Sequence, residues 1–113
     1  MNNVELKKII DDHQHWINGD CEGWQELKAD LRRADLRRAD LRGANLDYNC
    51  LPLWCGSLEA NFDSRQLKQI AYHLVKAGLQ SSNATDADRG ELSKLIDYAN
   101  EFHRADECGE IWR

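Results

Sequence analysis

Hydrophobic positions in the middle of the chain recur every five residues, with polar and charged residues between them. Positions 29–46 read Ala-Asp-Leu-Arg-Arg twice, then Ala-Asp-Leu-Arg-Gly and Ala-Asn-Leu. Five residues turn an α-helix by about 500°, which would splay successive leucines apart, and an odd spacing would place them on alternating faces of a strand. The leucines can share one interior only if the chain turns a corner in every unit, so the pattern predicts a solenoid. They are Leu31, Leu36, Leu41 and Leu46.

The pattern before the repeats is helical. Asn3 suits an N-cap and Gly19 a stop, so a helix is expected over residues 3–17. We expect it to cover the open end of the coil that the repeats form. Its apolar face would consist of Leu6, Ile9, Ile10, His13, Trp16 and Ile17.

The pattern after the repeats predicts a cap and two helices. Residues 51–58 are apolar with Pro and Gly breakers, and we interpret them as a cap over the second end of the coil. A helix is expected from Asp63 or Ser64 to near Gly78, and another from Thr85 to about residue 103. The tail 104–113 is charged and expected to be mobile. The expected buried residues are Leu67, Ile70, Ala71, Leu74 and Val75 in the first helix and Leu92, Leu95, Ile96, Ala99 and Phe102 in the second.

The motif A(D/N)LXX, with a small residue two positions before a central leucine, is the signature of the pentapeptide-repeat family, and about 25 residues of this chain resemble it. The resemblance implies a four-sided, right-handed β-helix with four units in each coil. It also implies that the small residues lie inside with the leucines. The register is lost where the next unit would centre on Gly56. The inward small residues would be Ala29, Ala34, Ala39 and Ala44.

We therefore expect an α+β fold in which about one coil of a short, right-handed quadrilateral β-helix is flanked by an N-terminal helix and a C-terminal helical pair. A single domain would span residues 1–113. Its segments would be an N-terminal helix and link (1–23), the repeat coil with its apolar cap (24–58) and a C-terminal helical region (59–113). One coil cannot complete its own core, so the helices or a second copy stacked on a coil end must supply neighbours.

Charge and hydropathy narrow the expected location and partners. The chain has 113 residues and a net charge of −5, which disfavours direct nucleic-acid binding. Its hydrophobic stretches are too short to cross a membrane, and the N-terminus is polar rather than a signal peptide. We expect a cytoplasmic protein that does not bind membranes.

Five arginines in the repeats form the candidate contact surface. They would lie on three sides of the coil, and guanidinium groups suit protein carboxylates or phosphates. Three readings remain open: the arginines pair with the repeat aspartates and only solvate the coil, they bind a partner protein, or they bind an anion or nucleotide. The residues are Arg32, Arg33, Arg37, Arg38 and Arg42.

Cysteine and histidine spacing supplies a candidate metal site. Cys50 and Cys55 are five residues apart, as are His103 and Cys108, and each spacing lets one short segment provide two zinc ligands. The alternatives are reduced thiols, typical of buried cysteines, or a disulfide such as Cys50 with Cys108. Apart from this structural zinc, no cofactor is expected.

Catalytic motifs are missing from the sequence. There is no Gly-rich phosphate loop, H-E-x-x-H or G-x-S-x-G, and no cysteine has a surrounding pattern typical of an activated thiolate. We expect a protein that is not an enzyme and has no catalytic residues.

The size and the helical flanks resemble short pentapeptide-repeat proteins of phages and prophages. That resemblance implies a phage-encoded inhibitor that acts in the host cytoplasm by binding a host protein, with an anti-CRISPR or other anti-defence role. One alternative is a sponge for small ligands, in which arginines of neighbouring protomers clamp a nucleotide. Another is a DNA mimic that inhibits a topoisomerase, which would require several copies to stack and is disfavoured by the outward arginines.

Overall fold

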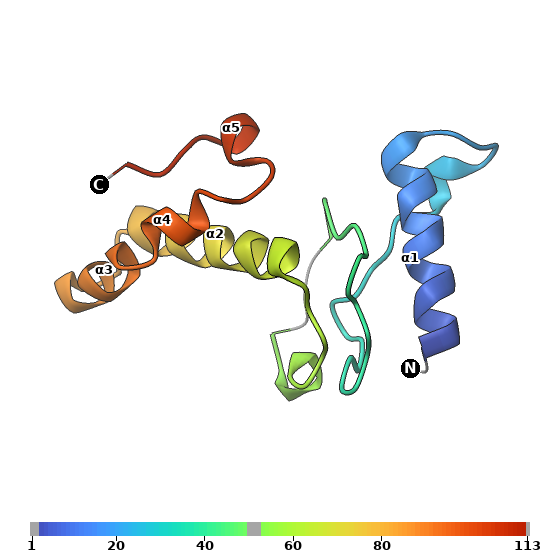
Figure 1. Cartoon of the computed structure of the whole chain (residues 1–113), viewed down its shortest axis with the longest axis horizontal. Helices are drawn as coiled ribbons and strands as arrows, with labels where there is room; N and C mark the ends of the chain where they lie inside the picture. The colour runs from blue at the N-terminus through green and yellow to red at the C-terminus, as the bar shows by residue number, and fades with distance from the viewer. Residues whose placement is uncertain (1–2, 50–52, 113) are drawn as a thin grey trace. The chain divides into compact units, whose positions relative to one another are not determined.

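The computed structural model describes residues 3–49 and 53–112. It divides into two compact units, Met1–Phe62 and Asp63–Arg113. Figure 1 shows a helix beside the repeat segment in the first unit and a helical cluster in the second. Each unit has its own hydrophobic core.

The first unit begins with helix α1, Asn3–Asn18, which confirms the helix predicted at 3–17. Its Leu6 side chain is buried in one cluster with Leu36, Ala39 and Leu41 of the repeats. His13 stacks on Trp16, and Trp16 contacts the ring of Tyr48. The helix therefore covers the interior of the repeat segment, as its apolar face predicts. A short 3-10 helix, η1, follows at Trp24–Glu26.

The repeats turn a corner in every unit. At each corner the amide of the small residue that starts a unit donates to the carbonyl of the leucine three residues before it. The predicted leucines are buried, Leu36 and Leu41 completely and Leu46 with 8% of its surface exposed. Ala29 and Ala39 are also buried, whereas Ala34 and Ala44 are only half-buried. The corner bonds are Ala34 N to Leu31 O, Ala39 N to Leu36 O, Ala44 N to Leu41 O and Asn49 N to Leu46 O, at 2.9–3.1 Å.

The expected quadrilateral β-helix is wrong for this chain. Residues 3–49 and 53–112 contain no β-strand, and the repeats form one isolated parallel bridge, between Asp40 and Asn61. Between two-residue turns each side of the coil is too short for a ladder, and only part of a second turn of chain lies beside it. The fold of the described residues is helical, with an irregular coil of turns.

The predicted cap over the coil's second end is also corrected. Residues 51 and 52 lie outside the described residues, and Leu53 and Leu58 are exposed rather than packed on the leucine interior. The segment runs alongside the earlier repeats instead. The Leu36 amide donates to the Gly56 carbonyl at 2.6 Å, and the Leu41 amide donates to the Asn61 carbonyl at 2.9 Å. The 3-10 helix η2, Cys55–Ser57, lies in this segment.

The indole ring of Trp54 occupies the space beside Gly56 where another residue would have its side chain. A Cβ built on Gly56 would lie 2.1 Å from Cζ2 of Trp54. The indole Nε1 of Trp54 donates to the Ala34 carbonyl at 3.2 Å, which holds the ring there. Gly56, expected to mark the loss of register, is thus buried and lies beside Leu36, twenty residues earlier.

The second unit is built on the long helix α2, Ser64–Gln80. Asp63 caps it: its side chain accepts from the Gln66 amide while the Gln66 side chain accepts from the Asp63 amide, which satisfies two otherwise unpaired donors. The start agrees with the prediction, and the end lies two residues beyond it. Leu67 and Leu74, predicted to be buried, are 44% and 55% exposed.

The predicted last helix is broken into shorter ones. Helix α3 spans Asp86–Ser93 after a Thr85 capping box, α4 spans Ile96–Ala99, and α5 spans Ala105–Cys108. The break at 94–95 lets Ile96 and Ala99 reach the core of the unit, while Leu95 is 41% exposed rather than buried. The core consists of Tyr72, Val75, Ile96, Ala99, Phe102, Ala105 and Ile111.

The charged tail is held against the second unit and is not the free end that its composition predicts. Asn100 donates to the Ile111 carbonyl and accepts from the Ile111 amide, both at 2.8 Å. The Lys76 ammonium donates to the carbonyls of Cys108 at 2.6 Å and Gly109 at 3.0 Å. These contacts bury Ile111 in the core.

Candidate functional site

Three of the five candidate arginines are bound by aspartates of their own repeat unit. Each of these aspartates accepts two parallel bonds from the guanidinium two residues later, through Nε and Nη2, at 2.6–2.9 Å. The same carboxylate also accepts from the backbone amide of that arginine, at 3.1–3.2 Å. The pairs are Asp30 with Arg32, Asp35 with Arg37 and Asp40 with Arg42.

These bonds alter the acidity of the carboxylates. Side-chain hydrogen bonds from Arg32 and Arg42, followed by the backbone amides of the same residues, lower the pKa of Asp30 and of Asp40 to about 2. The Arg37 side chain holds the pKa of Asp35 well below its usual range in the same way. All three pairs are exposed, so each adds little stability. Their main effect is to reduce the charge that Arg32, Arg37 and Arg42 offer to a partner.

Arg33 and Arg38 occupy the other arginine position of the repeat. Within the described residues, neither side chain makes a hydrogen bond or an ion pair. Arg38 borders a shallow cavity of about 310 Å³, together with Asp35, Arg37 and Glu59. Two carboxylates and two guanidinium groups face this cavity, so its charge is balanced and does not favour an anion.

An apolar stripe lies along α2 in the second unit. Leu67 and Leu74 are seven residues apart and therefore on the same side of the helix. Gly78 continues the stripe, and Leu92 of α3 lies over it, since a Cβ on Gly78 would come within 2.2 Å of the Leu92 Cδ1 atom. A groove of about 490 Å³ opens there. It is lined by Leu74, Gly78, Ser81, Asn83, Ala84, Asp88, Glu91 and Leu92.

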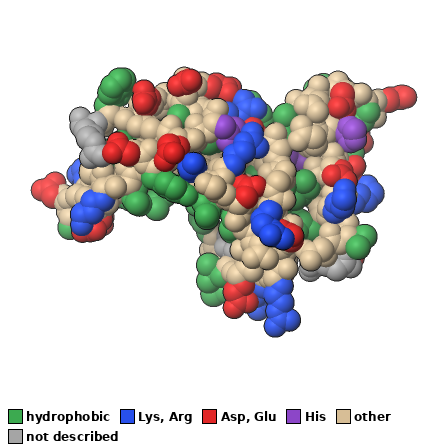
Figure 2. Space-filling model, in the orientation of Figure 1, with side chains coloured by type: hydrophobic (Ala, Val, Ile, Leu, Met, Phe, Trp, Pro, Cys, Tyr) green, Lys and Arg blue, Asp and Glu red, His purple; other side chains and the backbone are tan. Residues whose placement is uncertain are grey.

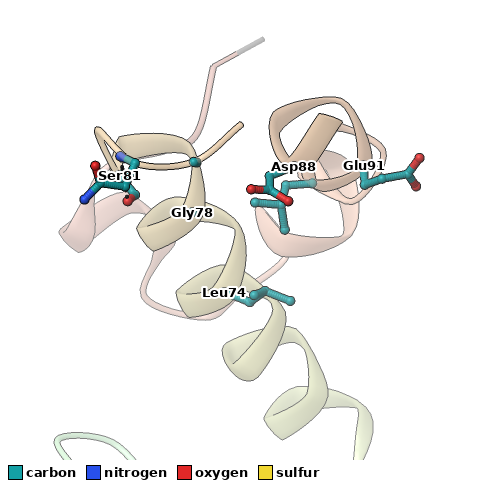
Figure 3. A pocket seen from close by; sticks show the side chains of 8 residues that line it. Leu74, Gly78, Ser81, Asp88 and Glu91 are labelled. Atoms are coloured by element: carbon teal, nitrogen blue, oxygen red, sulfur yellow. Dashed lines mark hydrogen bonds between the residues drawn. The ribbon is translucent and has the colours of Figure 1, made fainter. Parts of the chain in front are cut away.

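The groove has an apolar floor and an acidic border. Figure 3 shows Leu74 on α2, Asp88 on the side of α3 that faces α2, and Glu91 on its outer side. Asp88 accepts from the Thr85 amide, and this backbone bond lowers its pKa. Sequence reasoning missed the groove, because it assigned Leu67 and Leu74 to the buried face of α2.

Comparison with known proteins bears on the repeat segment. Residues 28–51 match the family model Pentapeptide repeats (8 copies). Neither the curated proteins nor the solved structures yielded a match to the chain. The pentapeptide repeats thus occupy about a fifth of the sequence, and the helices of the second unit lie outside the match.

The predicted zinc ligands are distributed over both units. Cys50 lies outside the described residues, and Cys55 is exposed in η2 next to the pentapeptide repeats. His103 contacts the ring of Phe102, and Cys108 is exposed at the end of α5. The four-ligand zinc site stays a prediction.

A different set of metal-binding side chains lies together just before the pentapeptide repeats. The ligand atoms of His15, Asp20 and Cys21 lie within 4.8 Å of one another. The His15 Nδ1 group donates to Asp20 Oδ1 at 2.6 Å, which lowers the pKa of Asp20. The sequence signal that could have identified this group is a histidine in the last turn of a helix, followed by Gly19 and then by Asp-Cys.

No helix in the described part of the chain combines the length and the apolar character needed to cross a bilayer.

Proposed function

We propose that this chain is a non-catalytic inhibitor that binds a partner protein through the apolar stripe of α2, defined by Leu67, Leu74 and the groove beside Gly78. The exposure of Leu67 and Leu74 carries the proposal. Figure 2 shows hydrophobic side chains gathered along the edge of the surface below α2. A contiguous apolar surface with a polar border is typical of a protein-binding site.

The chemistry of the groove indicates the kind of partner. Its floor is apolar, and the carboxylate of Asp88, on the side of α3 that faces α2, lies at its border, whereas the Glu91 carboxylate accepts from the Lys94 ammonium at 2.9 Å. A partner helix with apolar side chains on one face and lysine or arginine beside them complements both features. Docking of an amphipathic helix into such a groove is a common mode of recognition.

The repeat arginines support this assignment by exclusion. Arg32, Arg37 and Arg42 are each bound by a carboxylate of their own unit. The cavity beside Arg38 contains as many carboxylates as guanidinium groups. Within one chain, the described residues near Arg38 therefore do not supply a cationic pocket for a nucleotide, and we treat the coil as a scaffold.

Affinity capture with matched variants tests the proposal. The baits are the wild-type chain, L67D/L74D, R33E/R38E and L53D/L58D, the last of which changes two exposed leucines of the first unit. We expect one protein to be recovered by the wild type and by both control variants and to be lost with L67D/L74D. Equal recovery by the wild type and L67D/L74D would contradict the proposal.

A photo-crosslinking amino acid places the contact directly. At position 67 it should form a covalent adduct with the captured protein. Position 65 serves as the control. It is also exposed, but it lies two residues before position 67 and therefore about 200° away around the axis of α2. An adduct from position 65 and none from position 67 would assign the contact to another surface.

The finer expectation concerns the identity of the target. The resemblance to phage proteins supports a component of a host defence system, with CRISPR-Cas first. Expression of the chain in cells that restrict a targeted plasmid should restore plasmid transformation, and L67D/L74D should not. If the chain does not change restriction by any defence system tested, the proposed defence target is contradicted. The broader proposal, that the chain binds a partner protein through α2, is then the one that stays.

A further inference from the structure

We propose that His15, Asp20 and Cys21 form a Zn²⁺-binding site at the C-terminal end of α1, unrelated to the binding surface on α2. The three side chains offer one nitrogen, one oxygen and one sulfur ligand, each a type that Zn²⁺ accepts. Their ligand atoms all lie within 4.8 Å of one another.

The separation of the ligand atoms fits the metal. Zinc bonds of about 2.0–2.3 Å in a tetrahedral site place ligand atoms roughly 3.3–3.8 Å apart. His15 Nδ1 and Asp20 Oδ1 lie 2.6 Å apart because a proton lies between them. Replacing this proton by Zn²⁺ requires these two atoms to separate slightly, while Cys21 approaches by a side-chain rotation.

The backbone around the site is fixed before any metal binds. Gly19 adopts a left-handed conformation with φ 59°, and its amide donates to the His15 carbonyl at 2.8 Å. This turn reverses the chain and brings Asp20 and Cys21 back to the last turn of α1. The Trp24 amide then donates to the Cys21 carbonyl at 3.2 Å, which closes the loop on the other side.

A second interaction orients the carboxylate of Asp20. The side-chain amide of Asn18 donates to Asp20 Oδ2 at 3.4 Å, which leaves Oδ1 directed at His15. Such outer contacts orient metal ligands and raise affinity.

The surrounding charge favours a divalent cation. Residues 18–27 contain no lysine or arginine and carry three carboxylates. The negative end of the α1 dipole also lies here, because the helix ends at Asn18. His15 and Asp20 are about half exposed, at 48% and 44% of their side-chain surface, so an ion can reach them from solvent.

Three protein ligands leave the fourth tetrahedral position to water. On binding, the Cys21 thiol releases its proton to the buffer and its sulfur bonds to the metal as a thiolate. The His15 Nδ1 proton is also lost from that nitrogen, with the neutral ring carrying its proton on Nε2. Zinc would then join the end of α1 to the loop that leads into the repeats, and so stabilise the first unit.

Cobalt substitution tests the site in the full-length chain. Titration of the metal-free, reduced protein with Co²⁺ should produce a thiolate-to-cobalt absorption band and the intense visible bands of tetrahedral Co²⁺, and Zn²⁺ should abolish both. C21S should lose the thiolate band. H15Q and D20N should weaken binding by more than the roughly 10- to 100-fold typical of losing an outer contact.

Matched controls distinguish this site from the predicted four-ligand site. C55S and C108S remove exposed cysteines outside the cluster and should retain the full cobalt spectrum. Far-ultraviolet circular dichroism confirms that each variant is folded. The proposal is overturned if Co²⁺ gives no thiolate band with the wild type, or if C55S or C108S removes the band and C21S does not.

Discussion

The imidazole of His13 joins α1 to the end of the repeat segment through the Asp47 carbonyl, 2.6 Å from its Nε2 atom and 34 residues away in sequence. The other ring nitrogen, Nδ1, lies 3.1 Å from the Ala29 amide nitrogen and accepts a hydrogen bond from it. The ring must therefore be neutral with its proton on Nε2. It is 1% exposed, so both backbone groups depend on it.

Replacing His13 by Phe should strongly destabilise the first unit. The phenyl ring fills similar space but removes the acceptor of the Ala29 amide and a donor to the Asp47 carbonyl, and the loss of a hydrogen bond by a buried group costs about 1–3 kcal/mol. Urea denaturation should show the loss. His15→Phe is the matched control, because His15 is exposed; measured with a chelator present, it should change stability by about 0.5 kcal/mol or less. Equal effects of the two variants would contradict the role of His13.

The repeat carboxylates should titrate at unusually low pH. The pKa of Asp30 falls from 3.8 to about 2 in the folded chain, through its bonds to Arg32. Since the folded pKa lies below the unfolded one, this pair stabilises the fold above pH 3.8, and the contribution is lost as the pH falls through about 2. Carbon-13 NMR of the side-chain carboxyls measures this directly. Arg32→Met should return Asp30 towards 3.8 without moving Asp40, and an unchanged Asp30 would refute the assigned cause.

Replacement by glycine should change the stability of the chain in opposite directions at Arg38 and Arg33, which occupy the same position in successive repeat units. Arg38 has φ 64°, whereas Arg33 is not among the residues with positive φ. A left-handed conformation costs a residue other than glycine about 1–2 kcal/mol, so Arg38→Gly should raise the free energy of unfolding by up to about 1 kcal/mol. Arg33→Gly should lower it. Each variant removes one positive charge, so thermal denaturation of the pair isolates the backbone effect; stabilisation by both would contradict it.

The tail of the second unit should detach when Lys76 is changed. Lys76→Met removes the donor to the Cys108 and Gly109 carbonyls. Hydrogen exchange of the Ile111 amide should accelerate, because its bond to Asn100 then opens more often. Lys94→Met is the control, since Lys94 forms an ion pair with the exposed Glu91, three residues earlier in the chain. Equal exchange rates in the wild type and Lys76→Met would show that Lys76 does not hold the tail in place.

Sequence alone predicted the parts of the fold that depend on local periodicity. The five-residue spacing predicted a corner in every unit and the burial of Leu36 and Leu41, because no other path gives leucines at that spacing a shared interior. Helical periodicity and caps predicted α1 and the start of α2. These features follow from residues close together in the chain.

Features that depend on distant neighbours were missed. Leu67 and Leu74 have the spacing of core residues, but Tyr72 and Val75 take the buried face of α2. A β-ladder requires a complete second coil beside the first. The chain supplies only the stretch from Gly56 to Asn61, whose carbonyls accept from the Leu36 and Leu41 amides. The cluster of His15, Asp20 and Cys21 is local in sequence and was missed for a different reason: Gly19 was interpreted only as a helix stop, and not as the turn that brings Asp20 and Cys21 back to His15.

The internal pairing of aspartate with arginine makes each Asp–Leu–Arg triplet of the repeats electrically neutral. Every Asp–Leu–Arg triplet carries its own leucine for the interior and its own balanced ion pair for the surface, with both charges only two residues apart. Twenty added residues of the Ala-Asp-Leu-Arg-Arg sequence would therefore lengthen the coil and preserve the offset seen between Leu36 and Gly56, and they would add net positive charge only through the second arginine of each unit. Such a segment can grow or shrink by duplication during evolution while the surfaces that flank it continue to diverge independently.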